Sequence, residues 1–284
     1  MEEVCRRDRA SLFQSVGIQL MRIAVLMTCY NRVDTTLECL HRLFAQKIPK
    51  GYSLDVWLVD DASPDRTGER VKAFFPQVNV IQGTGRLFWS KGMRLAWDKA
   101  AETNNYDFYL WLNDDVRLKD DALVNLFNDY ERVGGVIVGT FSSDENEADV
   151  SYGATRDFPD GCSPKVGACG MNGNMVLVPK VVYDAVGPIC GKYHHQYGDY
   201  DYGWQLRKNG FEFYSSSHFC GVCPQQPERY KHLAGKNLWQ RIKLLWDPRG
   251  YDLHDAVLYK YRNFGLVRAA LSAGHVIYKV IRGV

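Results

Sequence analysis

Short apolar segments alternate with amphipathic segments through the first half of the chain. The apolar segments predict buried strands at residues 23–27, 54–59, 78–81 and 108–112. The segments between them repeat apolar residues at helical spacing and predict helices at 35–44, 68–75, 91–101 and about 121–130. Strands that alternate with helices in this way predict an α/β fold with a parallel, doubly wound sheet.

The alternation changes after Gly134 and Gly135. Shorter strands, antiparallel or mixed, are predicted at 136–141, 150–154, 174–178 and 211–214, with helical segments at 180–186 and 198–210. Farther along, the apolar residues of 238–246 and of 257–271 each fall on one helical face. We therefore expect an appendage at 1–20, one continuous domain at 21–225 with a mostly parallel sheet and a small mixed second sheet, and a helical extension at 226–284.

Composition narrows the class of protein. The 284 residues are 46% apolar and include 13 Phe, 17 Tyr and 7 Trp, which is enough for a full core, and the low Gly and Pro content excludes a disordered or fibrous chain. No apolar run approaches the roughly 18 residues of a membrane-spanning helix. The first residues are charged and hold no apolar export segment. We therefore expect a cytoplasmic protein.

Charge is unevenly distributed along the chain. The net charge of +2 is too small to indicate a nucleic-acid partner. Residues 228–284 carry a local net charge of +7, whereas residues 1–227 carry −5. A basic C-terminal part indicates either a solvated helical face or a surface that meets anions or lipid headgroups.

The eight cysteines do not form a metal-binding pattern. Only Cys220 and Cys223 have the spacing of zinc ligands, and a structural zinc site needs a second such pair. We expect reduced, partly buried thiols.

Polar loops follow the predicted strands, at the edge of the sheet where ligands bind in doubly wound folds. The strongest signal is Asn113-Asp114-Asp115, because adjacent carboxylates at a strand end need a cation or sugar hydroxyls to offset their charge. The alternative is a helix N-cap region. The Asp60-Asp61 pair is by itself compatible with ordinary turn chemistry.

A second acidic pair, Asp199 and Asp201, opens the helical segment at 198–210. A carboxylate at the mouth of a cleft can act as a general base on a hydroxyl, and a helix N-cap role for Asp199 is the alternative. His194 and His195, directly before this pair, are better explained as a surface or packed pair than as metal ligands.

Five motifs in order make the pattern specific. They are Thr28-Cys29-Tyr30-Asn31-Arg32, Val59-Asp60-Asp61-Ala62-Ser63-Pro64-Asp65, Trp111-Leu112-Asn113-Asp114-Asp115-Val116, Asn172-Gly173-Asn174-Met175-Val176-Leu177-Val178-Pro179 and Gly198-Asp199-Tyr200-Asp201-Tyr202-Gly203. This set resembles the family 2 glycosyltransferases over about residues 22–214, and within the family it is most similar to rhamnosyltransferase-like polysaccharide enzymes. The resemblance implies a GT-A fold and an inverting, nucleotide-sugar-dependent, metal-dependent reaction that uses Mg²⁺ or Mn²⁺.

The resemblance also implies roles for single residues. The nucleotide would be bordered by Thr28, Tyr30 and Arg32, its pyrimidine edge would be held by Asp60 and Asp61, and its ribose would lie near Asn113 and Asp114. The metal would be bound by Asp115, and the sugar and acceptor side would be lined by Asn172, Gly173 and Asn174. The catalytic base would be Asp199, supported by Asp201.

Two departures from the family pattern add candidates. The Gly-rich segment at 83–93 lacks the Asn that the family often carries, so Arg86 or Lys91 is expected to meet the diphosphate instead. No late His stands out as the last metal ligand. His218, His232 and His254 all qualify by position, and of these we favour His218 or His232.

We therefore expect transfer of a sugar from dTDP-rhamnose or a UDP-hexose to a hydroxyl of a glycan or lipid-linked acceptor in surface polysaccharide synthesis. The basic extension would then touch the inner face of the membrane. One alternative, a sugar-phosphate nucleotidyltransferase, should carry a Gly-rich basic loop where this chain has residues 28–32. The other, a non-catalytic nucleotide-sugar or glycan-binding scaffold, does not explain why both Asp115 and Asp199 are present. The oligomeric state is not indicated.

Overall fold

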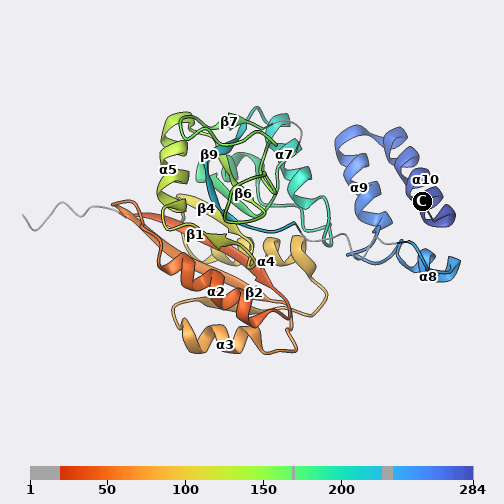
Figure 1. Cartoon of the computed structure of the whole chain (residues 1–284), viewed down its shortest axis with the longest axis horizontal. Coiled ribbons are helices and arrows are strands. Elements are labelled where there is room, and N and C mark those ends of the chain that lie inside the picture. The colour runs from red at the N-terminus through yellow and green to blue at the C-terminus, as the bar shows by residue number, and fades with distance from the viewer. Residues whose placement is uncertain (1–19, 168–169, 226–232, 284) are drawn as a thin grey trace, which may run out of the picture.

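The computed structural model describes residues 20–167, 170–225 and 233–283, so the appendage expected at 1–20 lies, except for Leu20, outside the described residues. Within the described ranges the strands form one nine-stranded sheet in the order β3-β2-β1-β4-β8-β6-β9-β5, with β7 paired to β9 (Figure 1). The strands are β1 (Met21–Cys29), β2 (Tyr52–Asp60), β3 (Asn79–Gln82), β4 (Phe108–Leu112), β5 (Arg117–Leu118), β6 (Val136–Ser142), β7 (Lys165–Val166), β8 (Met175–Pro179) and β9 (Phe213–Val222).

The first half of the sheet is parallel, as the alternating pattern predicts. β1 pairs in parallel with both β2 and β4, and β2 pairs in parallel with β3. The helices of the main domain are α2 (Val33–Phe44), α3 (Thr67–Phe74), α4 (Phe88–Thr103), α5 (Ala122–Val133), α6 (Lys180–Val186) and α7 (Gly198–Lys208). The predicted α/β fold class is confirmed.

Strand β1 is apolar from Ile23 to Met27, where both of its faces are covered. Successive side chains of a strand point to opposite faces. Ile23 and Val25 belong to a core that also contains buried residues of α2, α3 and α5, whereas Ala24 and Leu26 belong to a second core shared with α4, α6 and α7. The sheet therefore lies between two helical layers, and its carboxyl-end loops remain open between them.

The mixed strands do not form a separate second sheet. β8 pairs antiparallel with β4 and with β6, and β6 pairs in parallel with β9, so the mixed part continues the parallel part. Residues 150–154, expected as a strand, contribute only an isolated bridge between Phe141 and Tyr152.

Strand β9 is longer than its apolar pattern indicates. It runs from Phe213 to Val222 although Ser215, Ser216 and Ser217 interrupt the hydrophobic run. All three serines are buried and hydrogen-bonded; for example, the Ser217 hydroxyl donates to Asp129 over 2.6 Å. Satisfied hydroxyls are tolerated inside a sheet, which hydrophobic periodicity cannot indicate.

The extension contains three helices beyond residue 232, namely α8 (Leu238–Lys243), α9 (Leu253–Phe264) and α10 (Leu266–Arg282), which lie to one side of the sheet in Figure 1. The single helical face expected at 257–271 is divided at Gly265, whose φ of +84° lies in a region that favours glycine. Within the described residues, no helix combines the length and apolar character needed to span a membrane.

The six described cysteines, Cys29, Cys39, Cys162, Cys190, Cys220 and Cys223, are free, and four of them are buried. This agrees with the reduced thiols expected from their spacing.

Candidate active site

A cavity of about 490 Å³ lies at the carboxyl ends of β1, β2 and β4, as expected for a doubly wound sheet. It brings together predicted site residues that are far apart in the sequence. These are Thr28, Tyr30, Arg32, Asp61, Asn113, Asp114, Asp115 and Asn174. The remaining lining residues are Cys29, Asn31, Gly85, Phe88, Trp89, Tyr152, His195, Cys223 and Arg249.

The acidic pair of the cavity, Asp114 and Asp115, forms ion pairs with Arg32, which follows the neighbouring strand β1. The guanidinium of Arg32 donates to Asp115 over 2.8 Å and to Asp114 over 3.3 Å. The Thr36 hydroxyl donates to the other Asp114 oxygen over 3.0 Å. Burial raises the pKa of the Asp114 carboxyl to about 7; the Arg32 charge opposes this rise, and the Asp115 charge adds to it. Arg32 and Thr36 therefore hold the two carboxyl groups in place at the cavity wall.

Asp60 and Asp61 organise the loops around the cavity. The buried Asp60 carboxylate accepts the backbone N–H groups of Ser63 and Gly68 over 3.0 and 3.1 Å. Asp61 accepts three, from Gly85, Leu87 and Phe88, over 2.7 to 3.0 Å. Asp61 thus fixes the segment before α4 at the cavity edge, and it lines the cavity itself, whereas Asp60 does not.

One wall of the cavity is a chain of side-chain hydrogen bonds. The Trp89 indole N–H donates to Asn113 over 2.7 Å, and the Asn113 amide donates to Asn174 over 2.8 Å. The Asn174 side-chain amide contacts the Cys223 sulfur at 3.2 Å, and its backbone N–H donates to Asn172 over 3.0 Å. Such a network holds the wall in one arrangement.

Asp199 lies in the first turn of α7, close to Gly173 and Trp89, and does not itself line the cavity. Its carboxylate accepts the backbone N–H groups of Gly173 and Tyr200 over 3.0 and 2.8 Å. A Cβ on Gly173 would lie 2.4 Å from the Trp89 ring and 3.4 Å from the Asp199 Cβ, so this glycine permits a close approach of all three residues. The N-cap position belongs to Tyr197, not to Asp199.

Burial raises the pKa of the Asp199 carboxyl from 3.8 to about 6, while its two backbone hydrogen bonds oppose that rise. A carboxyl with this pKa is mostly ionised near pH 7 and is still a better proton acceptor than an ordinary aspartate. This combination is typical of a general base.

The other predicted site residues lie elsewhere. Asp201 is buried and bonds to Arg262 and Asn263 of α9, over 3.1 and 2.7 Å, so it anchors the extension. The Asp199 carboxylate is held instead by backbone amides. Neither Arg86 nor Lys91 lines the cavity.

Of the two histidine candidates, His218 is on β9, where its ring contacts the Ser217 hydroxyl and approaches Gly161; it does not line the cavity. His232 lies outside the described residues.

The sequence model of the family described as "Glycosyl transferase family 2" matches residues 24–165, half of the chain, which includes the loops that carry Arg32, Asp61 and the acidic pair. The chain belongs to glycosyl transferase family 2. This membership favours the glycosyltransferase hypothesis over the nucleotidyltransferase alternative.

Solved structures share the fold of this family 2 glycosyltransferase. The mannosyltransferase PcManGT from Pyrobaculum calidifontis, solved with GDP-Man and Mn²⁺, aligns with a TM-score of 0.55 at 15% identity over 99% of this chain and 83% of its own. Residues 1–349 of S. aureus TarS align with a TM-score of 0.57 at 13% identity over 92% and 81%, and the same TarS segment with UDP-GlcNAc aligns similarly, at 12% identity over 92% and 82%. These likenesses show the GT-A fold. Among curated proteins, none matches the sequence significantly.

Sequence reasoning missed several residues of this glycosyltransferase cavity. Phe88 and Trp89 lie within the Gly-rich segment at 83–93, and His195 precedes the Asp199 motif, so proximity to these motifs is a usable signal. Cys223 and Arg249 come from far along the chain, and no local pattern indicates them.

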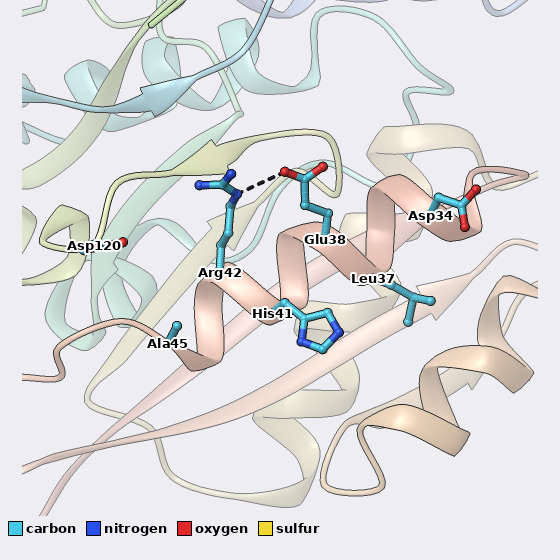
Figure 2. A pocket seen from close by; sticks show the side chains of 7 residues that line it. All are labelled: Asp34, Leu37, Glu38, His41, Arg42, Ala45 and Asp120. Atoms are coloured by element: carbon cyan, nitrogen blue, oxygen red, sulfur yellow. Dashed lines mark hydrogen bonds and ion pairs between the residues drawn. The ribbon is translucent and has the colours of Figure 1, made fainter.

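A second hollow lies on the solvent side of α2 (Figure 2). In it Arg42 points toward Glu38, 3.1 Å away, one turn earlier on the same helix. None of its lining residues belongs to the glycosyltransferase motifs, so we assign it no part in the reaction.

Proposed function

We propose that this family 2 glycosyltransferase transfers a sugar, with inversion, from a nucleoside-diphosphate sugar to a hydroxyl of a glycan or lipid-linked acceptor in surface polysaccharide synthesis. One observation carries the proposal. A half-buried carboxyl whose pKa is raised to about 6, that of Asp199, packs with Gly173 against Trp89, and Trp89 lines the cavity that holds the Asp114 and Asp115 pair.

The reaction assigns Asp199 one proton. As the acceptor oxygen attacks the anomeric carbon, its proton passes to the Asp199 carboxylate, and the bond from that carbon to the diphosphate oxygen breaks on the opposite face. The nucleoside diphosphate leaves with the bonding electron pair. A single displacement inverts the anomeric centre and needs one base and no covalent enzyme intermediate.

The acidic pair fits a divalent cation. Asp114 and Asp115 offer carboxylate oxygens, the ligands that Mg²⁺ and Mn²⁺ prefer, and their shared negative charge already attracts Arg32 in this structure. We assign metal binding to Asp115, with Asp114 and Asn113 nearer the ribose. When bound, the cation offsets the charge that develops on the departing diphosphate.

For the donor we favour a pyrimidine nucleotide, with dTDP-rhamnose first and a UDP-hexose second. The support is the motif resemblance to rhamnosyltransferase-like enzymes, and the cavity edge at Tyr30 and Asp61 would receive the base.

The first experiment is a thermal-shift panel of UDP, dTDP and GDP and their sugars, each with and without Mn²⁺ or Mg²⁺. A ligand that binds the folded state raises the unfolding midpoint by mass action. Metal-dependent stabilisation by dTDP or UDP is the expected result. Absence of any shift would remove the donor-site proposal and favour the non-catalytic scaffold.

We also propose peripheral contact with the cytoplasmic face of the membrane through α10. Val267, Leu271, Tyr278 and Ile281 recur every three to seven residues along α10 and expose 74%, 64%, 57% and 49% of their surface. An exposed apolar stripe beside basic residues is typical of helices that lie in a membrane interface. The neighbouring cations are Arg268, Lys279 and Arg282.

Co-sedimentation with vesicles that contain phosphatidylglycerol tests this contact. Replacement of the four stripe residues by serine should abolish binding. The matched control replaces Phe74 and Val181, which are equally exposed on α3 and α6, and should bind as the wild type does. Equal binding by all three proteins would remove the proposal.

A further inference from the structure

One residue of the C-terminal extension lines the cavity at the carboxyl ends of β1, β2 and β4. Arg249 lies in the segment between α8 and α9, and among the described residues beyond 232 it is the one that lines the cavity. Its guanidinium carbon is 5.8 Å from the centre of the Tyr30 ring and 5.9 Å from the centre of the Phe88 ring. Both rings also line the cavity, so Arg249 adds to the lining a cation close to two aromatic rings.

The backbone on both sides of Arg249 is fixed by one side chain. The Gln196 amide donates to the carbonyl of Pro248 over 3.2 Å and to the carbonyl of Gly250 over 2.7 Å. The Arg249 backbone N–H donates to the Asp247 carboxylate over 3.0 Å. Gln196 of the main domain and Asp247 of the extension therefore both hold the backbone at Arg249.

A second attachment joins the start of α9 to the same loop. The fully buried Asp255 carboxylate accepts the backbone N–H groups of His194, His195 and Gln196, over 3.0 to 3.2 Å, and the buried Asp252 carboxylate contacts the His194 ring nitrogen at 2.9 Å. This loop leads directly into α7 and Asp199. The segment that carries Arg249 and the segment that carries the proposed base are thus one connected structure.

The charges of the cavity indicate what Arg249 binds. Arg86 and Lys91, the cations expected at the diphosphate, are not in the lining, whereas Arg32 is. Arg249 is the second cationic side chain of the lining. A guanidinium binds two phosphate oxygens at once and stacks on aromatic rings, which a lysine does less well.

We propose that Arg249 binds the diphosphate of the nucleotide-sugar donor, so that the C-terminal extension completes the donor site. The inference rests on the proposed function, because it presupposes a nucleoside-diphosphate ligand in this cavity. Arg249 then holds the leaving group as its negative charge grows, which is where a fixed cation contributes to transition-state stabilisation.

Isothermal titration of the full-length protein in Mn²⁺ tests the proposal, with UDP, dTDP and GDP as ligands and the corresponding nucleosides as probes of the base subsite alone. Arg249→Ala should weaken diphosphate binding about tenfold or more, which is about 1.4 kcal/mol, and leave nucleoside binding unchanged. Arg249→Lys should recover part of the loss. Gln196→Ala should weaken diphosphate binding in the same selective way, and Arg268→Ala, an exposed arginine on α10, should change nothing.

The outcomes separate this inference from the proposed function. Wild-type protein that binds no nucleoside diphosphate overturns both. Wild-type protein that binds, together with an unchanged Arg249→Ala variant, overturns only the role of Arg249. Equal loss of nucleoside and diphosphate binding in Arg249→Ala, with a lowered unfolding midpoint, would show a structural role and would also overturn it.

Discussion

Arg32, at the end of β1, donates a hydrogen bond of 2.8 Å to Asp115, at the end of β4. The two strands are neighbours in the sheet, so residues more than 80 positions apart meet at its carboxyl edge. Their contact makes the acidic pair tolerable in a buried wall. A cation of higher charge at the same place would have to compete with Arg32 for the Asp115 carboxylate.

The metal proposal predicts that Mn²⁺ raises the unfolding midpoint of the wild type in the presence of UDP or dTDP, and that EDTA reverses the rise. Asp115→Ala should lose the metal-dependent part of the shift because it removes the assigned ligand. Asp184→Ala, which removes an exposed carboxylate paired only with Lys180, is the control and should keep the full shift. A full shift in Asp115→Ala would assign the metal to other residues.

Replacing the proposed base should separate catalysis from binding. Asp199→Asn keeps the size of the side chain and one of the two oxygens that accept the Gly173 and Tyr200 N–H groups, but it cannot take the acceptor proton, so we expect turnover to fall about 10²- to 10⁴-fold. Donor binding, measured by titration calorimetry, should stay within about threefold of the wild type. Loss of binding and turnover together would contradict the base assignment, and retained turnover would remove it.

The raised pKa of Asp199 predicts an acid limb in the pH profile. Below an apparent pKa of about 6 the carboxyl is protonated, so kcat/KM should fall about tenfold for each pH unit. The same shift acts on stability. Since the folded-state pKa lies above the ordinary 3.8, the proton stabilises the fold below about pH 4, and this contribution is lost as the pH rises to about 6.

Chemical denaturation between pH 4 and pH 7 measures that loss. The Asp199→Asn variant lacks the titrating group and should show a smaller decrease in the free energy of unfolding over this range. Identical decreases in variant and wild type would contradict the raised pKa.

The close packing around Gly173 leaves no room for even one additional methyl group. In Gly173→Ala the new Cβ would lie 2.4 Å from the Trp89 ring, so the ring must move away from Asn113. We expect a loss of about 1–3 kcal/mol in unfolding free energy, together with reduced turnover. In the control, Gly274→Ala, the new Cβ meets nothing within 4 Å on α10, and the variant should be as stable as the wild type or slightly more stable.

Local patterns predicted the parts of this structure that depend on local physics. Ile23 to Met27 are apolar because both faces of β1 are covered, and the alternation of such strands with helices is sufficient for the parallel half of the sheet. The loops at 28–32 and 113–115 follow from the same argument, since strand ends of a parallel sheet meet at one edge.

Other features depend on distant partners and leave no local signal. Ser215 to Ser217 interrupt an apolar run, yet they lie in β9 because backbone N–H groups and a carboxylate on other segments form hydrogen bonds with their hydroxyls. Arg249 follows a proline in an irregular segment, and the distant Gln196 holds the backbone on both sides of it by hydrogen bonds. Asp201 lies in a family motif, but its carboxylate accepts a hydrogen bond from Arg262, which lies more than 60 residues later in the chain.

The attachment of Asp255 to the loop at 194–196 has a consequence for the order of synthesis. A nascent polypeptide halted at residue 225 already contains every strand of the sheet and the acidic pair, but neither Arg249 nor the carboxylate that holds its segment. On the ribosome, the cavity therefore gains Arg249 as a lining residue only after α9 has emerged. We expect a nascent chain that has not yet exposed α9 to bind a nucleotide sugar more weakly than the 284-residue chain does.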